Sequence, residues 1–405
     1  MRILHTADWH LGDRLGRIDR TADLRRSVEK IARYCEQERV ELLLVAGDLF
    51  SELSRPDTLR ESIEHLQELF SPFLCKGGTI VAITGNHDNE NFCQTLRSAM
   101  TLAAPTAHEP GAVLPAGRFY LAAEPTVLRL ADGKENPIQL VLLPYPTPSR
   151  YLDSQAQRYK SVEEKNQALA AACRSRLRQL EEQPDFVSEL PTVLAAHLHV
   201  QGAQLSSLFR MSERESIVLA AADLPASYAY IALGHIHQPQ RLGGQSRIRY
   251  SGSIERLDLG ERHDDKSVVL VDIGPNGLQS EPVCLPIEAT PLYDVEIKNP
   301  REDLPRLRER FANADQALVR YHVTYTAGAD NLEEILRELD DIFPRWYDRE
   351  WREASNLGKP LGFVPGEPVK SFQDSVRDYL QSELHDHPDR AALLQLAEEL
   401  LAEEA

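Results

Sequence analysis

Five short polar segments of this sequence contain side chains of the kinds that bind divalent metal ions, and each follows an apolar run. The segments are Asp8-Trp9-His10, Gly47-Asp48, Gly85-Asn86-His87-Asp88, Ala196-His197-Leu198-His199 and Gly234-His235-Ile236-His237. Carboxylate, imidazole and amide groups without a thiolate suit Mn²⁺, Fe²⁺ or Zn²⁺. Seven ligands would overcrowd one ion, but two ions about 3.5 to 4 Å apart can share them if one carboxylate bridges, and Asp48 is the expected bridge. Such a pair holds the attacking and leaving oxygens of an in-line phosphoryl displacement.

The apolar runs before these segments predict buried strands of an α/β domain, because they are short and rich in Val, Ile and Leu. Two amphipathic stretches, Thr21 to Gln37 and Thr58 to Phe70, are expected to be helices and give a βαβαβ opening. Ligands bind at the carboxyl ends of strands in open α/β sheets, so the five segments are expected to share one cleft. The charged stretch Ser161 to Glu182 is expected to be a helical surface insertion. Strands are predicted at Met1 to His5, Glu41 to Ala46, Thr79 to Thr84, Ile138 to Leu143, Thr192 to Ala196, Tyr228 to Leu233 and Ser267 to Asp272.

After about Gly274 the pattern changes, and four elements predict a small α/β unit. Strands are expected at Tyr293 to Ile297 and Leu318 to Tyr325, and helices at Glu302 to Phe311 and Asn331 to Ile342. The segment Leu357 to Pro368 alternates Gly and Pro too densely for either element and is expected to be a linker. The predicted boundaries are 1–275 for the catalytic domain, 276–345 for the small domain, 346–370 for the linker and 371–405 for a helical tail. Near the linker, Trp346, Tyr347 and Trp351 are predicted to be packing residues rather than base-stacking platforms.

The tail is expected to contain two short amphipathic helices whose apolar stripes need a cover. Phe372, Val376, Tyr379 and Leu380 fall on one face of the first helix, and leucines form a stripe on the second. These stripes pack either on the chain's own domain or on a helix of a partner protein. We favour the partner, because two short helices cannot bury both stripes well by themselves.

The bulk composition restricts location and substrate affinity. A net charge of -18 argues against a chain that binds nucleic acid unaided, since contact with a phosphate backbone needs many Lys and Arg side chains on one face. Either metal ions and a basic partner offset the acidity, or the substrate is a small phosphate ester. Five scattered cysteines, the absence of a membrane-length apolar run and a start unlike a secretory signal predict a cytoplasmic protein with reduced thiols.

In their order, D-x-H, GD, GNH, H and GHxH, the five segments resemble the calcineurin-like metallophosphoesterase superfamily. More closely, MRILHTADWHLG, VAGDLF, ITGNHD, ALGHIH and RYSGSIERLDLGE resemble the SbcD family of nuclease subunits over roughly residues 1 to 275. The resemblance implies a calcineurin-like two-layer β-sandwich flanked by helices, a small α/β capping domain and a C-terminal segment that binds an ATPase. It also implies a metal-dependent DNA exonuclease and endonuclease, with Mn²⁺ as the expected metal. A homodimer within a heterotetramer, together with an SbcC-type SMC-like ATPase, is the implied assembly.

The resemblance also assigns roles to individual side chains. His87 is expected beside the metals, where it stabilises the pentacovalent phosphate or protonates the leaving oxygen. Asp88 is expected to orient His87 without binding a metal itself. One metal is expected at Asp8, His10, Asp48 and His237, and the other at Asp48, Asn86, His197 and His235.

Three further residues need an interpretation of their own. His199 would project to the same side of an extended strand as His197 and competes for its role, but the family's ligand directly follows the strand, so we favour His197. His5 lies within the first strand and is expected to be a hydrogen-bonded core residue. Ser51 departs from the family, because some members have a catalytic histidine directly after GDLF and serine cannot supply a proton near neutral pH.

Two other functions stay open at this point. A small-molecule phosphoesterase of the same superfamily would use the same metal site, since that site alone does not select a substrate. The added C-terminal unit and tail argue against it. A scaffold that has lost its metals is the second alternative, and the complete set of ligands argues against that one.

Overall fold

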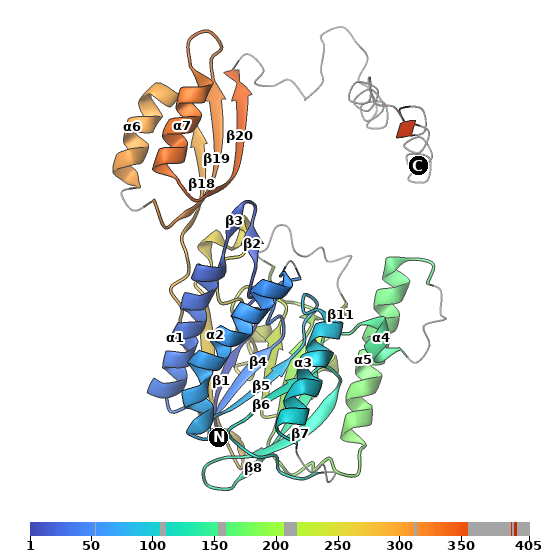
Figure 1. Cartoon of the computed structure of the whole chain (residues 1–405). Coiled ribbons are helices and arrows are strands. Elements are labelled where there is room, and N and C mark those ends of the chain that lie inside the picture. The colour runs from blue at the N-terminus through green and yellow to red at the C-terminus, as the bar shows by residue number, and fades with distance from the viewer. Residues whose placement is uncertain are drawn as a thin grey trace.

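The computed structural model describes residues 1–52, 54–105, 111–152, 159–205, 217–311 and 314–354, together with 390, 393 and 394. Two β-sheets lie face to face in the larger part of the chain (Figure 1). The first sheet has the strand order β16-β15-β1-β4-β5-β6, with β17 paired to β15, and the second has the order β13-β14-β12-β9-β8-β7. The first sheet contains β1 (Arg2–Thr6), β4 (Leu42–Ala46), β5 (Thr79–Ile83), β6 (Phe119–Ala122), β15 (Ser267–Gly274), β16 (Gly277–Leu278) and β17 (Val283–Pro286). The second contains β7 (Thr126–Ala131), β8 (Pro137–Leu143), β9 (Thr192–His197), β12 (Tyr230–Gly234), β13 (Gln240–Arg241) and β14 (Ile248–Tyr250).

Parallel strands occupy the middle of both sheets. Strand β4 pairs in parallel with β1 and β5, and β9 pairs in parallel with β8 and β12. Helix α1 (Thr21–Gln37) connects β1 to β4, and α2 (Pro56–Cys75) connects β4 to β5, so the predicted βαβαβ opening is confirmed. Because the chain direction is shared, the carboxyl ends of these central strands lie at one edge of each sheet.

Alternate residues of each strand face different apolar layers, as the period of two along a strand requires. Ile3 and Leu44 pack between the sheets against Leu142 and Tyr230 of the second sheet. On its other face the first sheet packs against α1, α2 and α3 (Glu90–Ala103), which Figure 1 shows as one layer of helices. The second sheet packs on its outer face against α5 (Val162–Glu181) and the short α4 (Pro148–Tyr151). The predicted two-layer sandwich with flanking helices is confirmed.

Helix α5 corrects one expectation. The predicted helix at Ser161 to Glu182 is present, but it is not a surface insertion, because Leu169, Cys173, Leu177 and Leu180 form a buried stripe against the second sheet. These four residues recur at the spacing of one helix face, and the charged residues of α5 occupy the remaining surface. The many charges on that remaining surface hid the stripe in the sequence.

The remainder of the described chain forms a second unit with its own apolar cluster. Strands β18 (Leu292–Ile297), β19 (Leu318–Tyr325) and β20 (Trp346–Glu353) pair in parallel, and α6 (Pro300–Arg310) and α7 (Leu332–Ile342) cover one face (Figure 1). The four predicted elements are confirmed. Two of the three predicted boundaries need correction: β16 and β17 still belong to the sandwich, and residues 346–353 are a strand rather than the start of a linker. Strand β20, WYDREWRE, is an edge strand with mostly polar and charged residues, so it lacks the apolar run by which the others were recognised.

The aromatic residues of β20 differ in their surroundings. Trp346 packs against the apolar cluster of the second unit, and Tyr347 packs against Leu292 and Leu318, as predicted for packing residues. Trp351 is 47% exposed, so the prediction is wrong for that residue. It lies on β20, an edge strand of this sheet.

Short elements join the two units. The hairpin of β2 (Arg14–Leu15) and β3 (Ile18–Asp19) reaches the second unit, where the Arg17 guanidinium lies 4.0 Å above the Trp346 ring and its Nε donates to the Trp346 carbonyl oxygen at 2.9 Å. Arg345 of the second unit forms an ion pair with Asp23 at the start of α1. The remaining short elements are β10 (His199–Val200), β11 (Val218–Leu219) and the 3-10 helices η1 (Ala221–Asp223), η2 (Leu242–Gly244) and η3 (Leu259–His263).

In the described residues, no helix combines the length and the apolar character needed to span a membrane. The expected partner-binding residues Phe372, Val376, Tyr379 and Leu380 lie outside the described residues.

Candidate metal centre

All the side chains predicted to bind metal follow or end the central strands of the two sheets, so both sheets contribute to one site. The structure brings the seven together, and six are buried, whereas Asn86 is exposed. The first sheet supplies Asp8 and His10 after β1, Asp48 after β4 and Asn86 after β5; the second supplies His197 at the end of β9, and His235 and His237 after β12.

The ligand atoms form two groups around Asp48, and Asp8 lies close to both, since it clusters with His10 and His237 and also with Asp48 and His197. On one side, Nε2 of His10 lies 3.6 Å from Oδ2 of Asp48. Ligand atoms of Asp8, His10 and His237 lie within 4.8 Å of one another. On the other side, Nε2 of His197 lies 3.2 Å from the same Asp48 oxygen and 3.0 Å from Oδ1 of Asn86.

His235 completes the second group, since its Nδ1 lies 2.8 Å from Oδ1 of Asn86. The Asp48 carboxylate therefore lies between the two groups, where the sequence predicted a bridging ligand.

The backbone of the site is held in unusual conformations. Asp8, His10, Asp48 and His235 have positive φ values of 53°, 46°, 52° and 91°, a region that residues with a side chain rarely adopt. Such residues cost about 1–3 kcal/mol each and cluster at functional sites. Their concentration at four of the seven predicted ligands indicates that the chain is bent to aim these side chains.

Glycines allow the loops to approach one another. A Cβ atom at Gly85 would lie 2.0 Å from Oδ1 of Asp48, and one at Gly47 would lie 2.1 Å from Nδ1 of His197. At Gly234 the nearest atom would be the Ala46 carbonyl oxygen, at 1.9 Å. The glycines of the GD, GN and GH motifs therefore leave room for the ligands of neighbouring loops.

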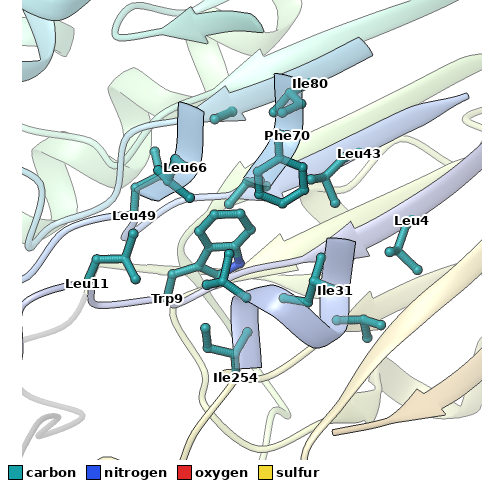
Figure 2. Close-up of a cluster of buried hydrophobic side chains, with 14 of the residues drawn as sticks. Leu4, Trp9, Leu11, Ile31, Leu43, Leu49, Leu66, Phe70, Ile80 and Ile254 are labelled. Atoms are coloured by element: carbon teal, nitrogen blue, oxygen red, sulfur yellow. The ribbon is translucent and has the colours of Figure 1, made fainter. Parts of the chain in front are cut away.

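Trp9 anchors the first loop on the side away from the ligands. Figure 2 shows its ring inside the apolar cluster under the helices, beside Phe70, with which it stacks at 6.2 Å. Its Nε1 donates to Oγ1 of Thr6 at 2.9 Å. Because Trp9 is buried in the core, Asp8 and His10 on either side of it are held at the site.

Burial and neighbouring charges set the protonation of the cluster. Burial raises the pKa of Asp8. Burial would also raise the pKa of Asp48, but the imidazoles of His197, His10 and His87 outweigh it and hold that pKa well below its ordinary value. Burial lowers the pKa of His197, whereas Asp48 and Asp8 outweigh it and raise the value to about 9. The cluster therefore keeps Asp48 negative and pairs it with a proton on His197, which a bound cation would replace.

A sequence profile described as calcineurin-like phosphoesterase matches residues 1–239. The chain belongs to this family. Among its relatives, the SbcD component of the nuclease SbcCD from Bacillus subtilis is 31% identical over 280 residues, which is 68% of this chain and 67% of the relative. The corresponding SbcD component from Escherichia coli K12 is 30% identical over 296 residues, 69% of this chain and 67% of the relative.

A protein of Aeropyrum pernix named DNA double-strand break repair protein Mre11 is 27% identical over 300 residues, 73% of this chain and 63% of that protein. The family membership that the sequence motifs predicted is thus confirmed. The chain is a metal-dependent phosphodiesterase of the calcineurin-like family.

The donor set fits the two divalent ions that the calcineurin-like family implies. Oxygen and imidazole ligands, with no thiolate among them, suit ions such as Mn²⁺, Fe²⁺ and Zn²⁺. Nδ1 of His235 and Nε2 of His197 both approach Oδ1 of Asn86, at 2.8 Å and 3.0 Å, as the ligand atoms of one ion would.

His87 lies at the open rim of this phosphoesterase site. Its ring centre is 4.9 Å from that of His10, and its backbone N–H donates to Oδ1 of Asp48 at 2.8 Å. A ring nitrogen of His87 also comes within 4.8 Å of ligand atoms of His10 and Asp48. The geometry therefore permits a catalytic role beside the metals or a place among the ligands, and the two can be separated by experiment.

The contacts of Asp88 differ from those expected. Its carboxylate accepts hydrogen bonds from the backbone N–H groups of Gly85 at 2.8 Å, Phe50 at 2.9 Å and Leu49 at 3.3 Å. The His87 ring instead lies beside the carboxylate of Glu52, which is 3.4 Å from Nδ1. Asp88 thus joins the loops after β4 and β5 and fixes Asp48 relative to Asn86, which positions ligands rather than His87.

The other interpreted residues behave as follows. His5 is fully buried and its Nδ1 lies 3.0 Å from the Tyr230 hydroxyl, which confirms the predicted core role. His197, and not His199, belongs to a candidate metal-binding group. The Ser51 hydroxyl donates to Oδ1 of Asp13 at 3.1 Å, so Ser51 binds the loop that follows β1.

Two residues near the site were not singled out by the sequence. Glu261 accepts a hydrogen bond from Nδ1 of His237 at 2.7 Å, across 24 residues of chain. Tyr145, after β8, has its ring centre 5.6 Å from that of His235 and 6.1 Å from that of His197. Glu261 lies in the segment that carried the family resemblance, but nothing in a single sequence pairs it with His237.

Proposed function

We propose that this phosphodiesterase is a DNA exonuclease and endonuclease that uses two Mn²⁺ ions and acts with an SMC-like ATPase of the SbcC type on DNA ends, hairpins and double-strand breaks. The observation that carries the proposal is the pair of ligand groups sharing Asp48, in a chain whose relatives are named as nucleases. Two metals in this arrangement suit in-line displacement at phosphorus.

We assign the first metal to Asp8, His10, Asp48 and His237 and the second to Asp48, Asn86, His197 and His235. When bound, the ions would activate water and neutralise charge on the phosphate. His87, half-buried at the rim, is placed to donate a proton or hydrogen bond to the phosphate or its leaving oxygen. The exposed side of Asn86 marks the direction from which the substrate enters.

The assignment of Asp48 has a direct test. Asp48→Ala should lose the ligand shared by both sites, so calorimetric titration with Mn²⁺ should show both sites weakened and the cleavage of linear DNA should be lost. In the unaltered protein, Mn²⁺ should support that cleavage and a chelator should abolish it. Two tightly held metals in Asp48→Ala, measured by elemental analysis, would contradict the bridge.

The substrate class needs its own measurement, because a small-molecule phosphoesterase would use the same metals. We expect kcat/KM for linear duplex DNA to exceed that for bis(p-nitrophenyl) phosphate by orders of magnitude when the ATPase is present. A chain that hydrolyses small diesters well and never cuts DNA, with or without the ATPase, would be the small-molecule enzyme instead.

The tail supplies the proposed contact with the ATPase. The net charge of -18 leaves the chain poorly suited to hold a polyanion alone, and relatives named as components of an SbcCD nuclease support a partner that contributes basic surface. We place Phe372, Val376, Tyr379 and Leu380 at that contact, in a cytoplasmic complex that contains two copies of this chain.

Deletion after Pro368 tests the role of the tail. The truncated protein should bind Mn²⁺ normally and hydrolyse bis(p-nitrophenyl) phosphate at a near-normal rate, since the predicted ligands all precede residue 240. Co-purification of the ATPase should be lost. In the full chain, Phe372→Ala and Leu380→Ala should each weaken binding to the ATPase by about 2 kcal/mol or more. Unchanged capture of the ATPase by the truncated protein would show that the tail packs on its own domain.

A further inference from the structure

A buried ion pair outside the predicted ligand set lies directly behind His237. Glu261 belongs to the 3-10 helix η3, and Lys266 lies just before β15. Their side chains are both fully buried, and Nζ of Lys266 lies 2.7 Å from Oε2 of Glu261. Burying two charges is costly unless each is well paired, so a pair in this position needs a reason beyond stability.

The two oxygens of Glu261 have separate partners. Oε1 accepts from Nδ1 of His237 at 2.7 Å. Oε2 accepts from Lys266, from the Ser253 hydroxyl at 3.1 Å and from the Leu257 backbone N–H at 3.2 Å. One oxygen is therefore fixed by three donors, and the other is aimed at the imidazole.

Lys266 holds the same histidine from its other end. Its ammonium group donates to the His237 carbonyl oxygen at 3.0 Å, to the Ser253 hydroxyl at 2.9 Å and to Oδ2 of Asp264 at 3.2 Å. His237 is thus held through its ring by Glu261 and through its backbone by Lys266. With Nδ1 engaged by Glu261, Nε2 faces Asp8, whose Oδ1 is 4.0 Å away.

His197, by contrast, is held by a neutral group, since its Nδ1 donates to the Ala46 carbonyl oxygen at 2.7 Å. Nδ1 of His235 lies against the amide oxygen of Asn86, itself a predicted ligand. A carboxylate behind a metal-bound imidazole fixes the tautomer and increases the basicity of the ligand more than a neutral acceptor does. Loss of the partner should therefore affect metal binding by His237 more than the loss of a neutral acceptor affects His197.

We propose that Glu261, kept in place by Lys266, is a positioning residue that fixes His237 with Nε2 toward the metal of the Asp8–His10 side, and so sets the affinity of that one metal site. The proposal rests on the proposed function in taking His237 as a ligand. It adds an asymmetry, because the site on the His197–His235 side has no such partner among the described residues.

The test compares metal binding in three folded proteins. Glu261→Gln with Lys266→Met replaces the ion pair by neutral side chains of similar size, so that neither Glu261 nor Lys266 is left as a buried charge without the other. Glu281→Gln is the control, because Glu281 also pairs with arginines but is 57% exposed and is not among the residues of the site. Each protein is titrated with Mn²⁺ by calorimetry, and the Mn²⁺ spectrum is recorded by electron paramagnetic resonance to distinguish a coupled pair from a single ion.

We expect the double variant to lose about 10- to 100-fold in affinity at one site and to keep the other, so that a single-ion spectrum replaces the coupled one at intermediate Mn²⁺. The control should match the unaltered protein. Unchanged affinity at both sites, or equal loss at both, would overturn the proposal.

If the double variant does not fold, Glu261→Asp carries the same test, since it keeps the charge but withdraws the carboxylate from His237. Failure of the unaltered protein to bind two Mn²⁺ ions would count against the proposed function itself. If the unaltered and the variant proteins both bound a tight pair of Mn²⁺ ions, the result would count only against the role of Glu261.

Discussion

A methyl group at Gly85 should damage the metal site more than its size suggests. The added Cβ would lie 2.0 Å from Oδ1 of Asp48 and 2.5 Å from its backbone nitrogen, and contacts shorter than 3.0 Å are essentially never seen. The loop or the carboxylate must therefore move by at least about 1 Å, which is the difference between the 2.0 Å contact with Oδ1 and the 3.0 Å limit. Gly85 does not have a positive φ, so an alanine there is not strained by the backbone itself.

Asp48 is the side chain that moves, and it serves both groups of ligands. We expect Gly85→Ala to weaken both Mn²⁺ sites and to slow DNA cleavage by about 10²-fold or more, since displacements near 1 Å have effects of that order. The free energy of unfolding, measured with denaturant in the presence of a chelator, should fall by about 1–3 kcal/mol, as is usual for overpacking.

Gly133→Ala is the matched control for this prediction. Its Cβ would meet only Oε1 of Glu41 at 3.4 Å, an ordinary contact, and its φ is also not positive. It should bind Mn²⁺ and unfold like the unaltered protein. If Gly85→Ala bound two Mn²⁺ ions with unaltered affinity, Asp48 could not be the shared ligand in the position that the structure gives it.

Three further changes have distinct expected outcomes. His87→Asn should keep both metals and lose about 10²- to 10⁴-fold in cleavage rate, whereas loss of a metal on calorimetric titration would make His87 a ligand. Asp88→Asn replaces one oxygen that accepts backbone N–H groups by a donor, so the chelated protein should unfold about 2–4 kcal/mol more easily, and unchanged stability would refute the bridging role of that carboxylate. Burial lowers the pKa of His5 to about 3, from 6.5 when exposed, so protonation favours the unfolded chain. Stability should then be lost as the pH falls from 6.5 toward 3, and His5→Gln should show a smaller loss over that range in denaturant titrations of the chelated protein.

The sequence predicted the central strands well because they are apolar on both faces, whereas the two-layer sandwich was implied by the family resemblance. Runs such as Leu42–Ala46 are fully buried, whereas a strand with one face in water would alternate apolar with polar residues. The ligands could be predicted for a related reason, since each directly follows such a run. Parallel pairing then places them at one edge whatever the details of the loops.

What the sequence did not predict depends on contacts between distant segments. Strand β20 is recognisable only once β19 is beside it, because its own residues are mainly charged. The apolar stripe of α5 is buried against the second sheet, whose strands come from other parts of the sequence. The role of Glu261 depends on its contacts with His237 and Lys266, which lie elsewhere in the chain, and a glutamate is ordinarily solvent-exposed.

The geometry of the site is stabilised by the fold and not by the metals alone. The loops after β1 and β4 continue beside one another beyond the sheet, with Asp8 N–H donating to the Gly47 carbonyl oxygen at 3.0 Å and Trp9 N–H to that of Asp48 at 2.8 Å. Trp9, Leu49 and Phe50 of these loops are buried in the apolar layer under the helices. Hydrogen bonds and burial on this scale can offset the cost of the positive φ values at Asp8 and Asp48. Because these contacts within the chain hold the loops, we expect metal binding to add stability to a folded chain, unlike the small metal-dependent domains that fold only when metal binds.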